Sequence, residues 1–132
     1  MRPTTPQTPP YALTIASSDA GGGAGIQADL KAMSAFGVYG GSVIVGVTAQ
    51  NTTGVSATES LPLPIIEQQY DAVLEDLPVA AVKTGMLATR EVVLWAADAL
   101  GAASFPVVVD PVMVATSGDQ LLADDAVEAY QA

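Results

Sequence analysis

The chain has no cysteine and no histidine among its 132 residues. Without cysteine it has no disulfide bonds, no thiolate nucleophile and no cysteine-based metal site. Without histidine it has neither the commonest zinc ligand nor imidazole acid–base chemistry. Any catalysis by these residues therefore depends on carboxylates, hydroxyls, lysine or backbone groups.

Basic residues are also scarce, because four lysines and arginines stand against fourteen acidic residues, for a net charge of −10. Nucleic acids and anionic membranes are bound by clustered Lys and Arg, so neither is expected as a partner. No apolar run reaches the length of a membrane span, and the proline-rich residues 1–10 lack the apolar core of a signal peptide. We therefore expect a cytoplasmic protein whose residues 1–10 form a flexible tail.

Half of the residues are apolar, which is enough for the core of one modest domain beginning at Tyr11. Short apolar runs alternate with helical patterns along the rest of the chain. The pattern predicts strands at 12–16, 42–48, 55–61, 79–83 and 106–109, and helices at 25–36, 64–76, 89–100 and 123–130. This alternation predicts an α/β fold, a three-layer α/β/α sandwich with a mostly parallel sheet.

Helical spacing predicts which side chains pack on the sheet. Two of the expected helices carry an apolar face: Ile26, Leu30, Met33 and Phe36 in one, and Ile66, Tyr70, Val73, Leu74 and Leu77 in the next. The continuous apolar run Val107–Val109 is typical of a parallel strand that helices cover on both sides.

Four glycines, Gly21, Gly22, Gly23 and Gly25, follow the first expected strand. Their spacing does not match the dinucleotide-binding fingerprint, and the chain has no Gly-Lys pair for a Walker A loop. The amides that open the next helix favour electronegative ligand atoms, and a turn that serves only strand-to-helix packing is the alternative. We expect Asp19 to brace this loop rather than to touch a ligand.

Polar residues follow four of the expected strands: Asp19, Gln50, Asn51, Lys83 and Asp110. The carboxyl ends of parallel strands lie at one edge of the sheet, where α/β proteins bind their ligands. The sequence therefore predicts a ligand site at this edge.

Four motifs give the chain a specific resemblance: Ala-Leu-Thr-Ile-Ala-x-Ser-Asp-x-x-Gly-Gly-Ala-Gly-Ile-Gln-Ala-Asp-Leu-Lys at 12–31, Val-Thr-Ala-Gln-Asn-Thr at 47–52, Val-Lys-Thr-Gly-Met-Leu at 82–87 and Val-Val-Asp-Pro-Val-Met-Val-Ala-Thr-Ser-Gly-Asp at 108–119. In order and spacing they resemble the hydroxymethylpyrimidine/phosphomethylpyrimidine kinases of thiamine biosynthesis, which have a ribokinase-like fold. The resemblance implies ATP-dependent phosphorylation of 4-amino-5-hydroxymethyl-2-methylpyrimidine and of its monophosphate.

The resemblance also implies the pyrimidine contacts, which are expected from Asp29, Gln50 and Met86 and from Gly22, Gly23 and Thr48. A carboxylate can accept from an exocyclic amino group, and a primary amide can donate and accept along an aminopyrimidine edge. A thioether suits an aromatic face. The plainer alternatives are a first-turn helix acid for the aspartate, a cap of its own loop for the glutamine, and core filling for the methionine.

The phosphate side of the site is expected at Asp110, which in the family lies toward the phosphates and their magnesium. The resemblance therefore implies ATP and Mg²⁺ as cofactors, with Asp110 as the magnesium ligand. The alternative for this aspartate is a role in fixing the turn before Pro111. Lys83 either neutralises phosphate charge or pairs with an acid. The polar loop 116–118 either approaches phosphate or is an ordinary turn. A homodimer is expected for the intact enzyme.

Two departures from the family pattern stand out. The family usually has glycine where Ser17 stands, so a hydroxymethyl group projects near the substrate loop and is expected to tighten it. The chain also lacks the family's Asn-x-x-Glu motif and its Gly-Thr-Gly-Cys anion hole, which carries the cysteine base. We therefore expect no catalytic base in this chain. We interpret residues 11–132 as the N-terminal, substrate-binding part of a kinase domain, with the base beyond Ala132.

Two other functions remain open at this point. Related kinases phosphorylate a hydroxymethyl group on a pyridine, so pyridoxal or pyridoxine kinase activity is one alternative, against which Gln50 and Met86 favour the aminopyrimidine. A non-catalytic pyrimidine-binding module is the other.

Overall fold

The computed structural model describes residues 8–132, so most of the expected flexible tail lies outside the described residues. The nine expected elements are all found, in the order β1 (Tyr11–Asp19), α1 (Gly25–Ala35), β2 (Tyr39–Asn51), β3 (Gly54–Ser60), α2 (Leu63–Asp76), β4 (Val79–Thr84), α3 (Arg90–Gly101), β5 (Val107–Val109) and α4 (Asp124–Gln131). Among residues 8–132, no helix combines the length and the apolar character needed to cross a membrane.

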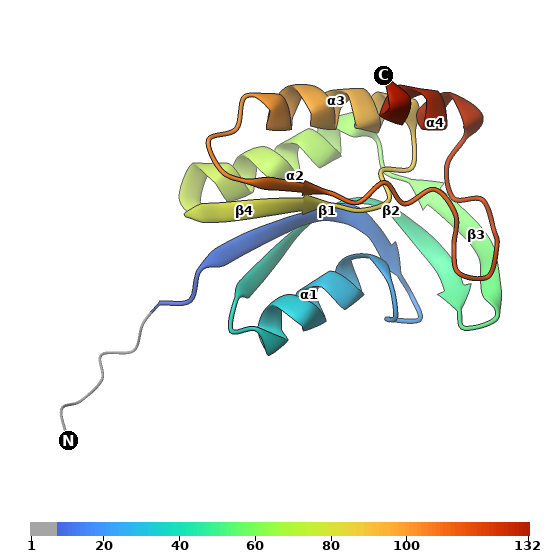
Figure 1. The fold of residues 1–132 in the computed structure, drawn as a ribbon, viewed down its shortest axis with the longest axis horizontal. Helices are drawn as coiled ribbons and strands as arrows, with labels where there is room; N and C mark the ends of the chain where they lie inside the picture. Colours follow the sequence, from blue (N-terminus) through green and yellow to red (C-terminus); the bar gives the residue numbers. More distant parts are fainter. Residues whose placement is uncertain (1–7) are drawn as a thin grey trace.

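The strands form one sheet in the order β3-β2-β1-β4-β5. Strand β1 pairs in parallel with β2 and β4, β4 pairs in parallel with β5, and only β3 runs antiparallel, against β2. Figure 1 shows α1 on one face of the sheet and α2, α3 and α4 on the other. The prediction of a three-layer α/β/α sandwich with a mostly parallel sheet is confirmed.

The core lies along the central strands, which helices cover on both faces. Leu13 and Ile15 of β1, together with Val43 and Val45 of β2, have no exposed surface, and Val82 of β4 is 1% exposed. Their apolar, mainly β-branched side chains suit a strand that is covered from both sides. This buried centre fixes the carboxyl ends of β1, β2 and β4 relative to one another.

Three expectations about packing are wrong in detail. Phe36 is 86% exposed because α1 ends at Ala35 and the phenylalanine is its C-terminal cap. Leu74 is 38% exposed, and Leu77, which is 36% exposed, lies beyond the end of α2 as its C-terminal cap.

The last strand also differs from the expectation. Val108 and Val109 are 62% and 60% exposed rather than covered on both sides. Strand β5 is the edge strand and pairs only with β4 in the part of the chain that the structure describes. The exposure of Val108 and Val109 thus belongs to the sheet as formed by residues 8–132.

Tyr130 links α4 to the carboxyl end of β4, because its phenol donates a hydrogen bond to the Gly85 carbonyl at 3.2 Å. Burial, and then the nearby charge of Asp110, raise the pKa of Tyr130 to about 12. The other tyrosines with a raised pKa, Tyr11 and Tyr70, owe it chiefly to burial as well.

We expect Tyr130 to ionise near pH 12, as the last phase of a phenolate absorbance titration of the folded protein. The folded state holds this proton more tightly than the unfolded chain, whose tyrosines ionise near pH ~10. The stability that the neutral phenol contributes is therefore complete below that pH and is lost as the pH rises towards about 12. Tyr130→Phe should remove this phase, and an unaltered titration curve in that variant would contradict the assignment.

Candidate functional site

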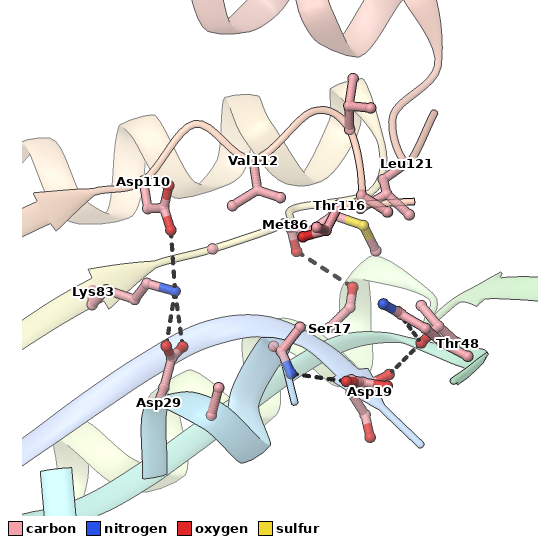
Figure 2. A pocket seen from close by; sticks show the side chains of 18 residues that line it. Ser17, Asp19, Asp29, Thr48, Lys83, Met86, Asp110, Val112, Thr116 and Leu121 are labelled. Carbon is pink, nitrogen blue, oxygen red and sulfur yellow. Dashed lines mark hydrogen bonds and ion pairs between the residues drawn. The ribbon is translucent and has the colours of Figure 1, made fainter. Parts of the chain in front are cut away.

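A pocket of about 260 Å³ opens at the carboxyl ends of β1, β2, β4 and β5, where the sequence placed the ligand site. It gathers six of the expected site residues into one lining: Asp29, Thr48, Gln50, Lys83, Met86 and Asp110. Figure 2 shows Asp29, Lys83 and Asp110 at one end of this pocket and Met86, Thr48 and Asp19 toward the other. Two further hollows, of about 380 and 390 Å³, lie beside it and on the α3–α4 side, and neither gathers such a set of charges.

Asp19 closes the turn between β1 and α1. Its carboxylate, on a residue 5% exposed, accepts hydrogen bonds from the amides of Gly21 at 2.7 Å, Gly23 at 2.9 Å and Ala24 at 2.8 Å. The prediction that Asp19 braces the loop is confirmed. These three loop amides hold a carboxylate of the chain itself, and the expectation that the amides opening α1 favour a ligand atom stays a prediction.

The same turn accounts for the positions of Gly22 and Gly23, which do not line the pocket. The Gly22 amide donates to the Asp19 carbonyl at 3.0 Å, and the residue has a φ of 77°, a left-handed conformation that glycine adopts without strain. Gly25, with a φ of 56°, is packed so closely that a Cβ there would lie 2.3 Å from the Ser17 carbonyl oxygen. These glycines shape the turn, and a substrate contact by Gly22 or Gly23 stays a prediction.

Gln27, which the sequence analysis missed, fastens the first turn of α1 to the end of β1. Its side-chain carbonyl accepts from the Asp19 amide at 2.8 Å, and its amide nitrogen donates to the Ser18 hydroxyl at 2.6 Å. The helix is thereby held against the strand, and Asp29 faces the pocket from the next half-turn.

Lys83 lies between two carboxylates (Figure 2). Its ammonium donates to both oxygens of Asp29, at 2.9 and 3.1 Å, and lies 3.7 Å from Asp110. The Asp29 and Lys83 side chains are 17% and 23% exposed, whereas that of Asp110 is 51% exposed. Of the two roles left open for Lys83, pairing with an acid is present in this structure. A role toward phosphate stays a prediction.

Thr14 is a second residue that the sequence analysis missed. Its hydroxyl, on a fully buried residue of β1, donates to Asp29 at 2.6 Å. The available signal was a hydroxyl inside an otherwise apolar strand, since a buried polar group needs a partner. Thr14 and Lys83 together occupy Asp29 from the sheet side.

The far end of the pocket is built on β2 and the segment after β4. The Thr48 hydroxyl lies 3.0 Å from the Ser18 carbonyl and 3.1 Å from the Gln50 side-chain oxygen. Met86 is 8% exposed, and its carbonyl accepts from the Ser17 hydroxyl at 3.3 Å. The Ser17 hydroxymethyl group thus ties the end of β1 to the methionine loop.

The loop that follows β5 is fastened to the start of β3. Asp119 accepts from the Ser117 hydroxyl at 2.6 Å and from the Val55 amide at 3.1 Å, and these two bonds, in that order, lower the pKa of its carboxyl. The Ser117 hydroxyl is therefore engaged within the chain. Thr116 lines the pocket, while Ser117 and Gly118 do not.

A family model described as phosphomethylpyrimidine kinase matches residues 19–132. A hydroxymethylpyrimidine/phosphomethylpyrimidine kinase of Rhizobium meliloti is 60% identical over 118 residues, which are 89% of this chain and 44% of that protein. A crystal structure of phosphomethylpyrimidine kinase from Clostridium difficile superposes with a TM-score of 0.83 at 51% identity, covering 91% of this chain and 52% of that one. The chain thus spans about half the length of these relatives.

A pyridoxal kinase is a more distant neighbour. The structure of the Staphylococcus aureus enzyme in complex with AMP-PCP and pyridoxal superposes with a TM-score of 0.74 at 35% identity, covering 85% of this chain and 42% of that one.

We expect Asp19→Ala to lower the free energy of unfolding by about 2–3 kcal/mol, because three amides lose a charged acceptor. Urea unfolding measures this change. Asp98→Ala, which removes an exposed carboxylate from α3, is the matched control and should shift stability by less than about 0.5 kcal/mol. Equal stability of the two variants would show that the Asp19 carboxylate does not hold the turn.

Proposed function

This chain belongs to the phosphomethylpyrimidine kinase family, and we propose that it is the substrate-binding half of a kinase that transfers phosphate from ATP to 4-amino-5-hydroxymethyl-2-methylpyrimidine and to its monophosphate. The observation that carries the proposal is the meeting of Asp29, Gln50 and Met86, from three separate segments, in one pocket. These are the residues expected to hold the ring.

The pocket suits a small polar heterocycle. The Met86 side chain offers a polarisable apolar surface to a ring face. Asp29 and Gln50 offer oxygen acceptors to the polar hydrogens of the ligand, the amino group and the hydroxymethyl group. A volume of about 260 Å³ fits a single substituted ring and little more.

Asp110 and Lys83 stand at the end of the pocket where phosphate would lie. Of the three carboxylates in the lining, Asp19 and Asp29 accept hydrogen bonds from the chain, whereas half-exposed Asp110 has only the longer ion pair with Lys83, at 3.7 Å, and is the best placed to reach a cation. One carboxylate together with substrate phosphates is a usual way to hold magnesium, so the residues present fit Mg²⁺. When bound, the ion would neutralise phosphate charge, and Lys83 adds a second positive charge beside it.

A second candidate function is pyridoxal phosphorylation, which the likeness to the S. aureus enzyme supports at lower identity. A pyridoxal ring presents a different pattern of donors and acceptors to Gln50. Binding of pyridoxal more tightly than the aminopyrimidine, in direct competition, would favour this function. The homodimer and the cytoplasmic location expected from the sequence stay predictions.

We expect Asp29→Ala to weaken binding of 4-amino-5-hydroxymethyl-2-methylpyrimidine by about 1–3 kcal/mol, because a polar hydrogen of the ligand loses its acceptor. Isothermal titration calorimetry with the parent protein and the variant measures the change. Asp98→Ala should bind as the parent does, and equal affinity of Asp29→Ala and the parent would remove Asp29 from the proposed pocket.

The 132-residue chain alone should bind the pyrimidine without phosphorylating it. In this proposal the base and the donors that face the transferred phosphoryl group lie beyond Ala132, and such groups lower a barrier by several kcal/mol, or about 10²–10³-fold in rate for a single donor. A coupled assay of ADP release decides the point. Turnover above background would show that the catalytic base lies among these 132 residues. Asp110 would then be the first carboxylate to replace in a search for that base.

A further inference from the structure

Two hollows meet at the end of β1. The pocket of about 260 Å³ that gathers the site residues and the neighbouring hollow of about 380 Å³ share three lining residues, Ser17, Met86 and Leu121. The rest of the larger hollow is lined mainly by β3, by the segment after β4 and by the residues before α4. The three shared residues therefore form a partition between the ligand pocket and a space that the proposed function does not use.

Ser17 holds this partition together. Its hydroxyl, on a residue 3% exposed, donates to the Met86 carbonyl at 3.3 Å. One hydroxymethyl group thus connects the end of β1 with the segment after β4. Figure 2 shows this bond apart from the ion pairs of Lys83. Without the Ser17 side chain, the space between its backbone and the Met86 carbonyl would join the two hollows.

The pairing of β1 with β2 makes room for this side chain. The register shifts between Ala16 and Ser18, so that one extra residue of β2 lies opposite Ser17, as in a β-bulge. This part of β2 contains Gly46, where a Cβ would lie 3.3 Å from the Ser17 hydroxyl oxygen. The missing side chain at position 46 accommodates the hydroxymethyl group at position 17, so the partition is closely fitted.

The shape of the pyrimidine determines which substituent meets the partition. Ring atom C2, which carries the methyl group, lies directly across the ring from C5, which carries the hydroxymethyl group. In the proposed function the hydroxymethyl group points toward Lys83 and Asp110, where the phosphate would lie. The methyl group then points away from these charges, toward the end of the pocket that Ser17 and Met86 close.

We propose that Ser17 is a specificity-determining residue, whose hydroxymethyl group closes the pocket behind the C2 substituent and excludes pyrimidines that carry a longer chain than methyl at C2. The inference rests on the proposed function for the ligand and for its direction in the pocket. The closure itself is a property of the free protein, because it depends on the protein's own residues Ser17, Met86 and Leu121.

The partition is tested first without a ligand, by crystal structures of the parent protein and of Ser17→Gly. We expect two separate hollows in the parent and one continuous cavity in Ser17→Gly. Ser42 of β2 lines neither hollow, so Ser42→Gly is the matched control and should keep the hollows separate. If the Met86 segment moves onto β1 in Ser17→Gly and keeps the hollows apart, the proposal is overturned, whatever ligand the protein binds.

The consequence for specificity is tested by calorimetry with 4-amino-5-hydroxymethyl-2-methylpyrimidine and its 2-propyl homologue. The parent protein should bind the propyl compound at least about 10-fold more weakly than the methyl compound. Ser17→Gly should bind the propyl compound about 10-fold more tightly than the parent does, because each newly buried methylene contributes about fourfold in affinity. Affinity for the methyl compound should change less than about threefold, and Ser42→Gly should bind both compounds as the parent does.

Two further variants separate the size of the side chain from its hydrogen bond. Ser17→Cys keeps a side chain of similar size and should preserve the preference for the methyl compound. Ser17→Ala keeps only the Cβ and should relax the preference in part, and it supplies the comparison if Ser17→Gly is poorly folded. An equal loss of affinity for both compounds in the glycine and alanine variants would make Ser17 structural only and would overturn the inference.

The outcomes separate this inference from the proposed function. A parent protein that binds the methyl and propyl compounds equally well would overturn the inference and leave the proposed function in place. A parent protein that binds neither compound would overturn the proposed function, and the role of Ser17 in specificity with it. The crystal structures of the free protein would still decide whether Ser17 separates the two hollows.

Discussion

The geometry of the pocket depends on the turn between β1 and α1. In this turn the Asp19 carboxylate accepts hydrogen bonds from three backbone amides. A loop of this kind, left open, attracts anions to its amides and to the helix N-terminus. Here the chain fills that position with its own side chain. Gln27 then fixes the helix to the strand, and Asp29 comes to lie opposite Lys83. The turn thus positions the Asp29 carboxylate at the pocket.

Lys83 carries that constraint across the sheet. Its side chain projects from β4, and its ammonium contacts the Asp29 carboxylate of α1 and the Asp110 carboxylate that follows β5. One ammonium therefore links the α1 side of the pocket to its β5 side. With Asp29 and Asp110 the three groups sum to one net negative charge, in a chain whose total charge is −10. A phosphorylated ligand brings further negative charge, which is why the proposed function needs a metal cation beside Asp110.

The sequence predicted the parts of this structure that local pattern determines. Alternation of apolar runs and helical spacing gave the nine elements, and polar residues at strand ends gave the site, because parallel strands end at one edge. It could not predict which strand lies at the edge of the sheet, and hence that Val108 and Val109 are exposed. It also could not predict partners that meet only in the fold, such as Thr14 with Asp29, or that Asp19 would use the amides of Gly21 and Gly23.

In the proposed function, the pocket between Asp29, Gln50 and Met86 receives the aminopyrimidine ring. The most direct measurement is a crystal structure of the protein with 4-amino-5-hydroxymethyl-2-methylpyrimidine at saturating concentration. We expect the ring to lie against Met86, with its amino group at Gln50 and its hydroxymethyl group toward Lys83 and Asp110. A ring bound in the apolar hollow beside α3 and α4, or a pocket that stays empty at saturation, would contradict it.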